Sequence, residues 1–296
     1  MFRKVFLNFY LIILRKFSKG KGLGKKYSVV KSFSNKIESS LKTDHAQVWA
    51  GKMFLHPNDA FRLSIYGIHS ELDLEIFKKY VKKGSNVIDI GANIGYFTLI
   101  LAKLVGPTGK VFAFEPDPRN ISLLKKNIEI NKYENVTIIP KAVSNVNGKC
   151  TLYTSQDSFG QNRIYEPKKT RNQEFIPIEA ETISLDDFFK NENIIDSISF
   201  VKIDVEGAEK LVLDSMKNIL KNNDRIKIFS EIDLARLNDA GSNYKEVIDF
   251  FYENNFTIFL VDEKKHAIIK MNKKSLASIL ENEPDSQNIL CLRENS

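Results

Sequence analysis

Short apolar runs alternate with amphipathic segments along the chain beyond Gly84, and this alternation predicts a sheet covered by helices. The predicted strands are the runs at 86–91, 109–116, 135–143, 198–204, 225–232, 256–262 and 288–293. Apolar residues at helical spacing predict helices at about 95–105, 118–131, 208–220 and 244–254. Buried strands that alternate with helices are typical of a parallel sheet with helices on both faces, so we expect an α/β fold.

The segments outside this alternation divide the chain further. Residues 43–84 predict short strands and then a helix at about 70–81, and we interpret them as a cap or lid in front of a catalytic domain at 85–296. Within that domain, residues 148–190 interrupt the alternation and are predicted to shape a substrate site. Donors that would suit a polyhydroxylated acceptor include Gln156, Asn162 and Arg163. A solvated loop explains the same composition.

The positive charge of the chain is confined to its first 42 residues. Of 44 Lys/Arg and 37 Asp/Glu in all, eleven basic residues and one acid lie in residues 1–42, which leaves 33 basic and 36 acidic residues in the remainder. Binding to nucleic acid needs basic residues beside the active site, so we expect no nucleic-acid partner for this body. The two cysteines, Cys150 and Cys291, show no metal-ligand spacing and favour a reducing, cytoplasmic location.

Residues 1–26 begin the basic arm with an amphipathic pattern. One apolar stripe is formed by Phe2, Val5, Phe6, Phe9, Ile12, Ile13 and Phe17. The continuous apolar run at 9–14 is far shorter than the roughly 20 residues that a membrane-spanning helix needs. We therefore expect a helix that lies on an anionic membrane surface, which would make the protein peripheral. A helix packed on the protein's own body and a disordered basic tail are the alternatives.

A nucleoside-binding pattern follows the first two predicted strands. Gly91 and Gly95 allow a tight turn after the first strand, and Glu115 at the end of the second can accept hydrogen bonds from ribose hydroxyls. A dinucleotide site would have a third glycine and room for a pyrophosphate, whereas Asp89 directly before this turn suits a cationic amino group. S-adenosylmethionine carries an ammonium, a sulfonium and a ribose but no phosphate. The pattern therefore favours methyl transfer.

Three motifs occur in order along the chain, namely NVIDIGANIGYFTLILAKLVGPTGKVFAFEPDP, NVTIIPKAVS and FVKIDVEGAE. Over about 66–233 the chain resembles the FkbM family of class I S-adenosylmethionine-dependent methyltransferases. The resemblance implies a Rossmann-like, seven-stranded, mostly parallel sheet whose last strand is antiparallel. It also implies O-methylation of a hydroxyl on a sugar, glycolipid or related small-molecule acceptor. Methylation of nucleic acid or protein, and a membrane-tethered cofactor-binding module without catalysis, are the competing interpretations.

The resemblance also implies the residues of the cofactor site. They are Asp89, Gly91, Ala92, Asn93, Gly95, Phe97, Glu115, Pro116, Ala142, Val143 and Asp204. Asp89 is expected at the methionine end of the cofactor, directly or through water, and Glu115 at the ribose. Ala142 and Val143, which follow the third predicted strand, are expected near the adenine.

The acids Asp204, Glu206 and Glu209 follow the fourth predicted strand within six positions. Asp204 and Glu206 are candidate catalytic residues, with Asp204 as general base for an acceptor hydroxyl. Glu209 is expected in the first turn of a helix, where a carboxylate complements the helix dipole. Glu231 ends the fifth strand as a third catalytic candidate, and Asp204 with Glu231 would alternatively bind Mg²⁺. Asp233, a candidate substrate contact, stands where the family often has a histidine.

Overall fold

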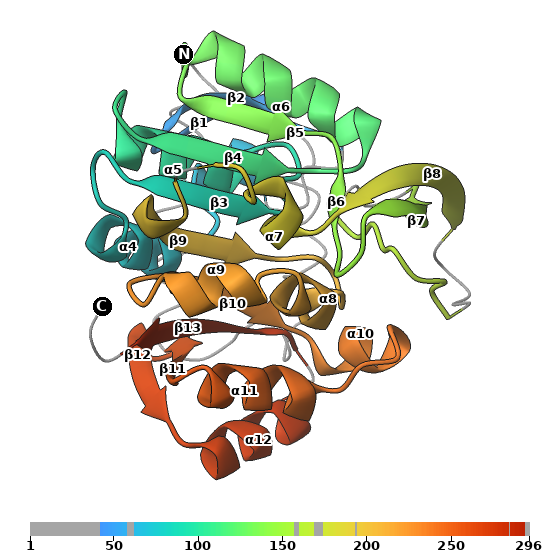
Figure 1. Cartoon of the computed structure of the whole chain (residues 1–296). Coiled ribbons are helices and arrows are strands. Elements are labelled where there is room, and N and C mark those ends of the chain that lie inside the picture. Colours follow the sequence, from blue (N-terminus) through green and yellow to red (C-terminus); the bar gives the residue numbers. More distant parts are fainter. Residues whose placement is uncertain are drawn as a thin grey trace, which may run out of the picture. The chain divides into compact units, whose positions relative to one another are not determined.

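The computed structural model describes residues 42–57, 62–156, 160–168, 174–192, 194–283 and 285–293, and Figure 1 shows the whole chain. The chain divides into two compact units between His69 and Ser70. The first unit contains the antiparallel strands β1 (His45–Val48) and β2 (Gly51–Phe54) and the short helix α3 (Leu63–Tyr66). The second unit contains the large sheet and every candidate site residue.

The helix predicted at 70–81 is α4 (Glu71–Tyr80), and it is the first element of the second unit. The unit boundary therefore lies before this helix and not at the predicted residue 84. Phe77 fixes α4 against the sheet, because its ring centroid lies 5.0 Å from that of Phe200 and 5.1 Å from that of Phe229. A third ring, Phe97, lies 5.3 Å away. The packing of these rings places α4 beside the strands that carry the candidate site.

The large sheet has eight strands in the order β12-β11-β13-β10-β9-β3-β4-β5. Their bounds are β3 Asn86–Ile90, β4 Lys110–Phe114, β5 Val136–Ile139, β9 Ile198–Ile203, β10 Lys227–Ile232, β11 Phe256–Asp262, β12 Ala267–Met271 and β13 Gln287–Arg293. The five neighbouring strands β10, β9, β3, β4 and β5 are parallel. Strand β13 is antiparallel to both of its neighbours, as predicted. The eighth strand, β12, was not predicted, because most of its apolar side chains are only half-buried at the edge of the sheet.

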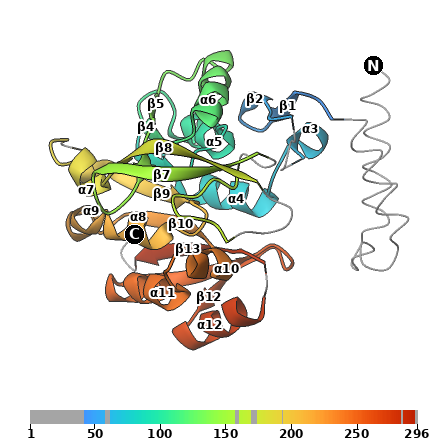
Figure 2. The same cartoon turned by 90° about the vertical axis from the view of Figure 1, so that its right-hand side faces the viewer.

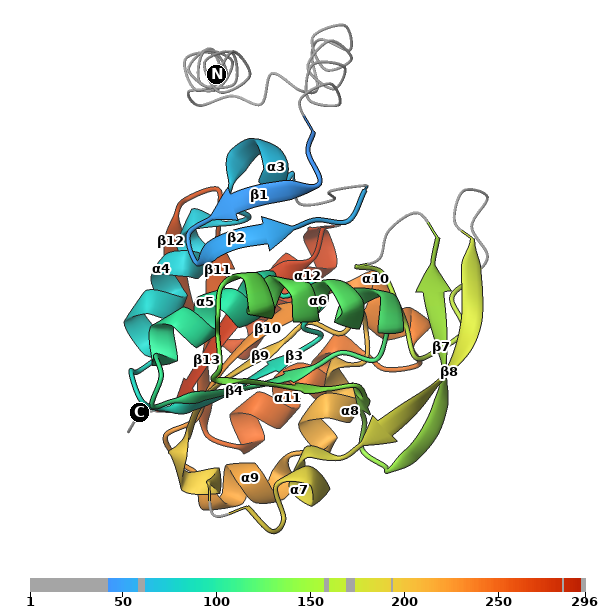
Figure 3. The ribbon, with the colours of Figure 1, turned by 90° about the horizontal axis from the view of Figure 1, so that it is seen from above.

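Two groups of helices cover the sheet, one on each face (Figure 3). One group is α4, α5 (Tyr96–Val105) and α6 (Pro118–Ile130), and the other is α7 (Leu185–Phe188), α8 (Glu209–Asp214), α9 (Lys217–Asn222) and α11 (Tyr244–Glu253). Four of the described α-helices were not predicted, namely α10 (Leu234–Asp239), α12 (Lys273–Asn282) and the short α3 and α7. The single helix predicted at 208–220 is divided into α8 and α9, because the Ser215 carbonyl accepts from the Asp186 N–H (2.8 Å) instead of continuing the helix.

The predicted insertion at 148–190 forms most of a second, three-stranded sheet. Its strands are β6 (Ala142–Val143), β7 (Gly148–Ser155) and β8 (Phe175–Ile183), with β8 in the middle. The strand predicted at 135–143 is thus split between two sheets, since Pro140 has no N–H for a ladder. The β7–β8 pair lies beyond the carboxyl ends of the parallel strands (Figures 1 and 2).

The arm predicted at 1–42 lies outside the described residues apart from Lys42. Across the part of the chain that is described, no helix has both the length and the apolar content to cross a bilayer.

Candidate active site

The glycine turn after β3 is held between two other strands. The N–H groups of Gly91 and Ala92 both donate to the Phe114 carbonyl at 3.0 Å, which ties the turn to the end of β4. On the other side, a Cβ at Gly91 would lie 1.9 Å from the Asp204 carbonyl oxygen, so the close approach to β9 requires glycine. Gly95 has φ +98°, and a Cβ there would lie 2.6 Å from Leu124. The sequence prediction of a tight turn at these glycines is confirmed.

Glu115 lies directly against this turn. One carboxylate oxygen accepts from the Asn93 N–H (2.8 Å), and the other accepts from the Asp117 N–H (2.9 Å) and from the Asn120 side chain (3.3 Å). Burial raises the pKa of Glu115 to about 7, although the two backbone N–H groups oppose this. The oxygen that accepts from Asn93 still has a lone pair for a further donor. Glu115 therefore has the position and the chemistry expected of a residue that accepts from a ribose hydroxyl.

Asp89 is fully buried beneath the turn. One carboxylate oxygen accepts from the Thr98 hydroxyl at 2.6 Å, and the other lies 3.4 Å from the Lys202 ammonium. Asp89 was expected to meet the methionine end of the cofactor. Its contacts among the described residues are those with Thr98 and Lys202, and the contact with the cofactor stays a prediction.

Lys202 is a site residue that our sequence analysis missed. Its side chain is 3% exposed, and its ammonium donates to the Gly91 carbonyl at 2.8 Å and lies 3.5 Å from Asp204. Burial alone would lower the pKa of Lys202, but Asp204 and Asp89 outweigh it and the pKa is raised. The ammonium therefore stays charged and holds Gly91 and Asp204 together. The sequence contained a signal for this pair, because an acid and a lysine each interrupt an apolar strand. The two strands are adjacent, and Asp89 and Lys202 occupy paired positions in them.

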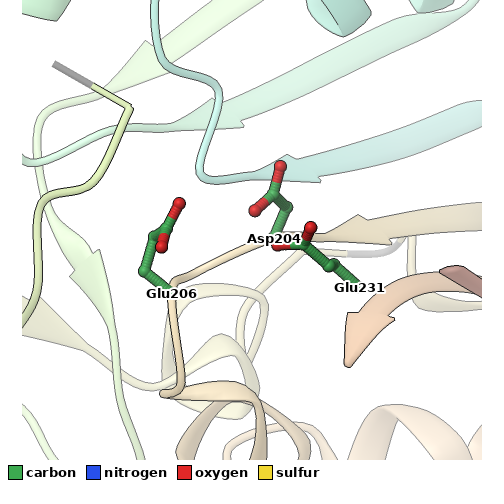
Figure 4. Close-up of side chains that lie close together, drawn as sticks. All are labelled: Asp204, Glu206 and Glu231. Carbon is green, nitrogen blue, oxygen red and sulfur yellow. The ribbon is translucent and has the colours of Figure 1, made fainter. Parts of the chain in front are cut away.

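Three predicted catalytic acids come together at the carboxyl ends of β9 and β10. Asp204, Glu206 and Glu231 each place a carboxylate oxygen within 4.8 Å of the other two, and Figure 4 shows the three side chains. Asp204 is the most accessible, with 33% of its side chain exposed against 12% for Glu206 and 24% for Glu231. This acid cluster is the candidate catalytic centre.

Arg236 of α10 neutralises part of the acid cluster. Its guanidinium bonds to Glu206 and lies 3.5 Å from Glu231. Burial raises the pKa of Glu231 to about 8, and the nearby Asp204 carboxylate adds to the effect. Burial also raises the pKa of Glu206, and Arg236 opposes that rise. The cluster therefore contains groups that exchange protons near neutral pH.

A divalent cation does not fit the acid cluster as it stands. Carboxylate oxygens are the ligands that Mg²⁺ prefers. Here, however, the Arg236 guanidinium contacts two of the three carboxylates, and Lys202 lies 3.5 Å from the third, Asp204. A metal ion would have to displace these cations. We derive no chemistry through a metal at this site.

The backbone conformation of Glu206 also helps to position its side chain. It has φ +59°, a left-handed conformation that is rare outside glycine. The Tyr165 hydroxyl donates to its carbonyl at 2.8 Å, and the next residue, Gly207, packs so closely that a Cβ would lie 2.6 Å from the Arg236 carbonyl. Glu209 begins α8 and is 2% exposed, with its carboxylate accepting from the Gly207 N–H at 3.1 Å. This agrees with the structural role expected for Glu209.

Asp233 and Asn162 make internal contacts instead of presenting free groups to an acceptor. Asp233 is the N-cap of α10, where it accepts from the Arg236 N–H at 3.0 Å and lies 3.2 Å from the Arg236 Nε. The Asn162 amide donates to Asp117 at 2.8 Å and accepts from the Ser155 N–H at 3.1 Å. Both residues therefore have a structural role in this arrangement.

The other predicted site residues differ in burial and in their contacts. The Arg163 guanidinium lies over the rings of Tyr165 (5.9 Å) and Phe175 (5.5 Å), and its backbone pairs with β7. Gln156 is exposed. Ala142 and Val143 are buried in β6, while Phe97 and Pro116 are half-buried.

The strand order, the glycine turn and the carboxylate beside it define a class I S-adenosylmethionine-dependent methyltransferase. The sequence profile of the Methyltransferase FkbM domain matches residues 89–258, which is more than half of the chain. The protein therefore belongs to the FkbM methyltransferase family.

Several characterised proteins are similar in sequence. Methyltransferase 1 of Beauveria bassiana is 26% identical over 195 residues, which cover 60% of this chain and 74% of that protein. Methyltransferase sdnD of Sordaria araneosa is 28% identical over 195 residues, or 52% of this chain and 73% of that protein. The 2-O-methyltransferase NoeI of Sinorhizobium fredii is 28% identical over 145 residues, or 45% of this chain and 58% of that protein.

Solved structures show a weaker likeness. Precorrin-6y C5,15-methyltransferase from Geobacter metallireducens has a TM-score of 0.43 at 11% identity, over 77% of this chain and 90% of that one. Fibrillarin from Aeropyrum pernix, with bound S-adenosyl-L-methionine, has a TM-score of 0.42 at 13% identity, over 75% of this chain and 74% of that one. A likeness of this degree has no bearing on the reaction or the substrate.

Proposed function

We propose that this methyltransferase transfers the methyl group of S-adenosylmethionine to a hydroxyl oxygen of a sugar, glycolipid or related small molecule. The observation that carries the proposal is the acid cluster beside the glycine turn. Methyl transfer to a hydroxyl releases a proton, and a carboxylate at the reacting oxygen can accept it. Asp204 is the most exposed acid of the cluster, and its backbone abuts Gly91 of the turn.

The residues of the glycine turn fit S-adenosylmethionine. Gly91 and Gly95 let the turn pack closely against Asp204 and Leu124, and the Glu115 carboxylate beside Asn93 offers an open acceptor for a ribose hydroxyl. When bound, the cofactor supplies an electrophilic methyl group on its sulfonium.

In the proposed reaction, Asp204 takes the hydroxyl proton as the acceptor oxygen is methylated. The Lys202 ammonium lies 3.5 Å from Asp204 and holds its carboxylate beside the glycine turn. Glu231, whose pKa burial raises to about 8, can in turn share the proton with its neighbours. Arg236 orients Glu206 and Glu231 around the same point.

Two observations support the acceptor class. The β7–β8 pair lies beyond the carboxyl ends of the parallel strands and carries polar side chains, and Gln156 directly after β7 is exposed. The similar protein NoeI is a 2-O-methyltransferase. Both observations favour a small hydroxylated acceptor over nucleic acid or protein.

The test is a transfer assay with S-adenosylmethionine labelled in its methyl group and with glycolipid, oligosaccharide, protein and RNA acceptors. We expect label in a glycolipid or oligosaccharide, as an ether that survives mild alkali. Alkali-labile label would indicate a carboxyl ester, and label in RNA or protein alone would contradict the proposed acceptor. The Asp204→Asn variant should lose turnover but still bind S-adenosylhomocysteine, with Glu134→Gln on the exposed surface as a control.

A further inference from the structure

Asp73 of α4 has a buried carboxylate that lacks a partner. The residue is 1% exposed, and neither carboxylate oxygen has a hydrogen-bond partner among the described residues. The hydroxyl of Ser70 lies close enough to lower the pKa of Asp73, but its hydrogen bond is made to Glu263. A buried carboxylate without a partner costs several kcal/mol unless it is protonated, and a bound cation would stabilise its ionised form.

The position of Asp73 is beside the candidate active site. It lies one helical turn before Phe77 and so faces the same side of α4. Phe77 packs against Phe97 of the predicted cofactor site and against Phe200 of β9. The pKa of Asp73 is raised to about 7, mainly by burial and then by the carboxylates of Glu263 and Asp204, while the Ser70 hydroxyl opposes the rise.

The other acids around the turn already have partners. Asp89 accepts from Thr98 and faces Lys202, and Glu115 accepts from backbone N–H groups. Among the described buried acids around the turn, Asp73 is therefore the one in which neither carboxylate oxygen accepts a hydrogen bond. S-adenosylmethionine brings a donor, since its methionine half carries an α-ammonium with three N–H groups.

We infer that Asp73 binds the α-ammonium of S-adenosylmethionine. The inference rests on the proposed function, because it takes the cofactor as given. It transfers to Asp73 the role that the sequence had suggested for Asp89. Since α4 precedes the matched residues 89–258, the helix adds a cofactor contact from outside the family's shared segment.

The experiment compares two ligands by titration calorimetry. S-adenosylhomocysteine contains the amino-acid half, whereas 5′-methylthioadenosine keeps the nucleoside and sulfur but lacks it. Asp73→Asn should weaken S-adenosylhomocysteine binding by about tenfold or more and leave 5′-methylthioadenosine binding within about twofold. The control Glu75→Gln, an exposed acid on the same helix, should change neither.

Three outcomes would overturn the inference. They are unchanged S-adenosylhomocysteine affinity in Asp73→Asn, an equal loss for both ligands, and a response to Mg²⁺ alone that the substitution removes. If the variant does not fold, the wild-type protein and an S-adenosylhomocysteine analogue without the amino group still test the inference. That analogue should bind about tenfold more weakly or worse, and equal binding contradicts the assignment. If wild type binds neither S-adenosylhomocysteine nor 5′-methylthioadenosine, the proposed function itself fails.

Discussion

Lys202 and Asp89 face each other at paired positions of two buried strands, with the ammonium 3.4 Å from a carboxylate oxygen. Both side chains are almost completely buried, so neither charge is compensated by water. Removal of one partner leaves the other as an uncompensated charge, whereas removal of both does not. The pair is therefore a structural requirement for the glycine turn above it.

Lys202→Met is expected to lower the free energy of unfolding by about 3–5 kcal/mol, because it leaves Asp89 buried and unpaired. The double variant Lys202→Met/Asp89→Asn should recover a large part of this loss. Urea unfolding measures both, with Lys110→Met at an exposed position as the control. Additive losses in the double variant would show that the two side chains are not coupled.

Glu115→Ala is expected to weaken the binding of both S-adenosylhomocysteine and 5′-methylthioadenosine by about tenfold or more, because both ligands contain the ribose. This pattern differs from the one expected for Asp73→Asn. Calorimetric titration checks it, with Glu134→Ala as a matched control on the exposed surface. Affinity that stays within about twofold would remove Glu115 from the ribose site.

The stability of the protein is expected to fall as pH rises from about 5 to 8. Burial raises the pKa of Asp73, Glu115 and Glu209 to about 7 and that of Glu231 to about 8. In the unfolded chain these groups titrate near pH 4, so the folded protein binds more protons between about pH 4 and 8. Stability from these groups is therefore complete below about pH 4 and is lost as pH rises through 7 to 8.

Thermal unfolding at constant ionic strength measures this trend. Glu209→Gln should flatten the fall in Tm, because the amide oxygen can still accept from the Gly207 N–H but no longer ionises. A Tm that rises across the same window would contradict the assignment of these acids as protonated in the folded state.

Turnover is expected to survive EDTA and metal-free dialysis, because Arg236 and Lys202 already lie against the three carboxylates. The measurement is methyl transfer before and after dialysis, with and without added Mg²⁺. Activity that disappears and returns with Mg²⁺ would restore Asp204 and Glu231 as metal ligands.

Binding of the basic arm to an anionic membrane surface stays a prediction. Deletion of residues 1–26 should abolish sedimentation with anionic liposomes, and high salt should weaken sedimentation of the full chain through screening. Neutral liposomes are the control. Equal sedimentation with and without the arm would contradict a membrane role for it.

Much of the fold could be predicted from local pattern, because each buried strand is a short apolar run bounded by polar turns. Local chemistry also located the glycine turn and Glu115. The contacts of Asp73, Lys202 and Arg236 could not be read in the same way, since each depends on which strands and helices become neighbours.

The insertion shows the same dependence on neighbours. Asn162 was expected as a candidate substrate contact in a polar loop, and its amide donates to Asp117, which is 45 positions away. Polar composition predicts that hydrogen bonds form but does not identify the partner.

The contact between Gly91 and the Asp204 carbonyl has a consequence for protein engineering. Since a Cβ atom at position 91 would fall 1.9 Å from that oxygen, the loop proposed to receive the methyl donor packs directly against the strand that ends in the proposed base. A designer who reshapes the donor pocket through this loop would also shift the base, and acceptor preference would change with it. Selectivity for the donor and for the acceptor therefore cannot be optimised independently through residue 91.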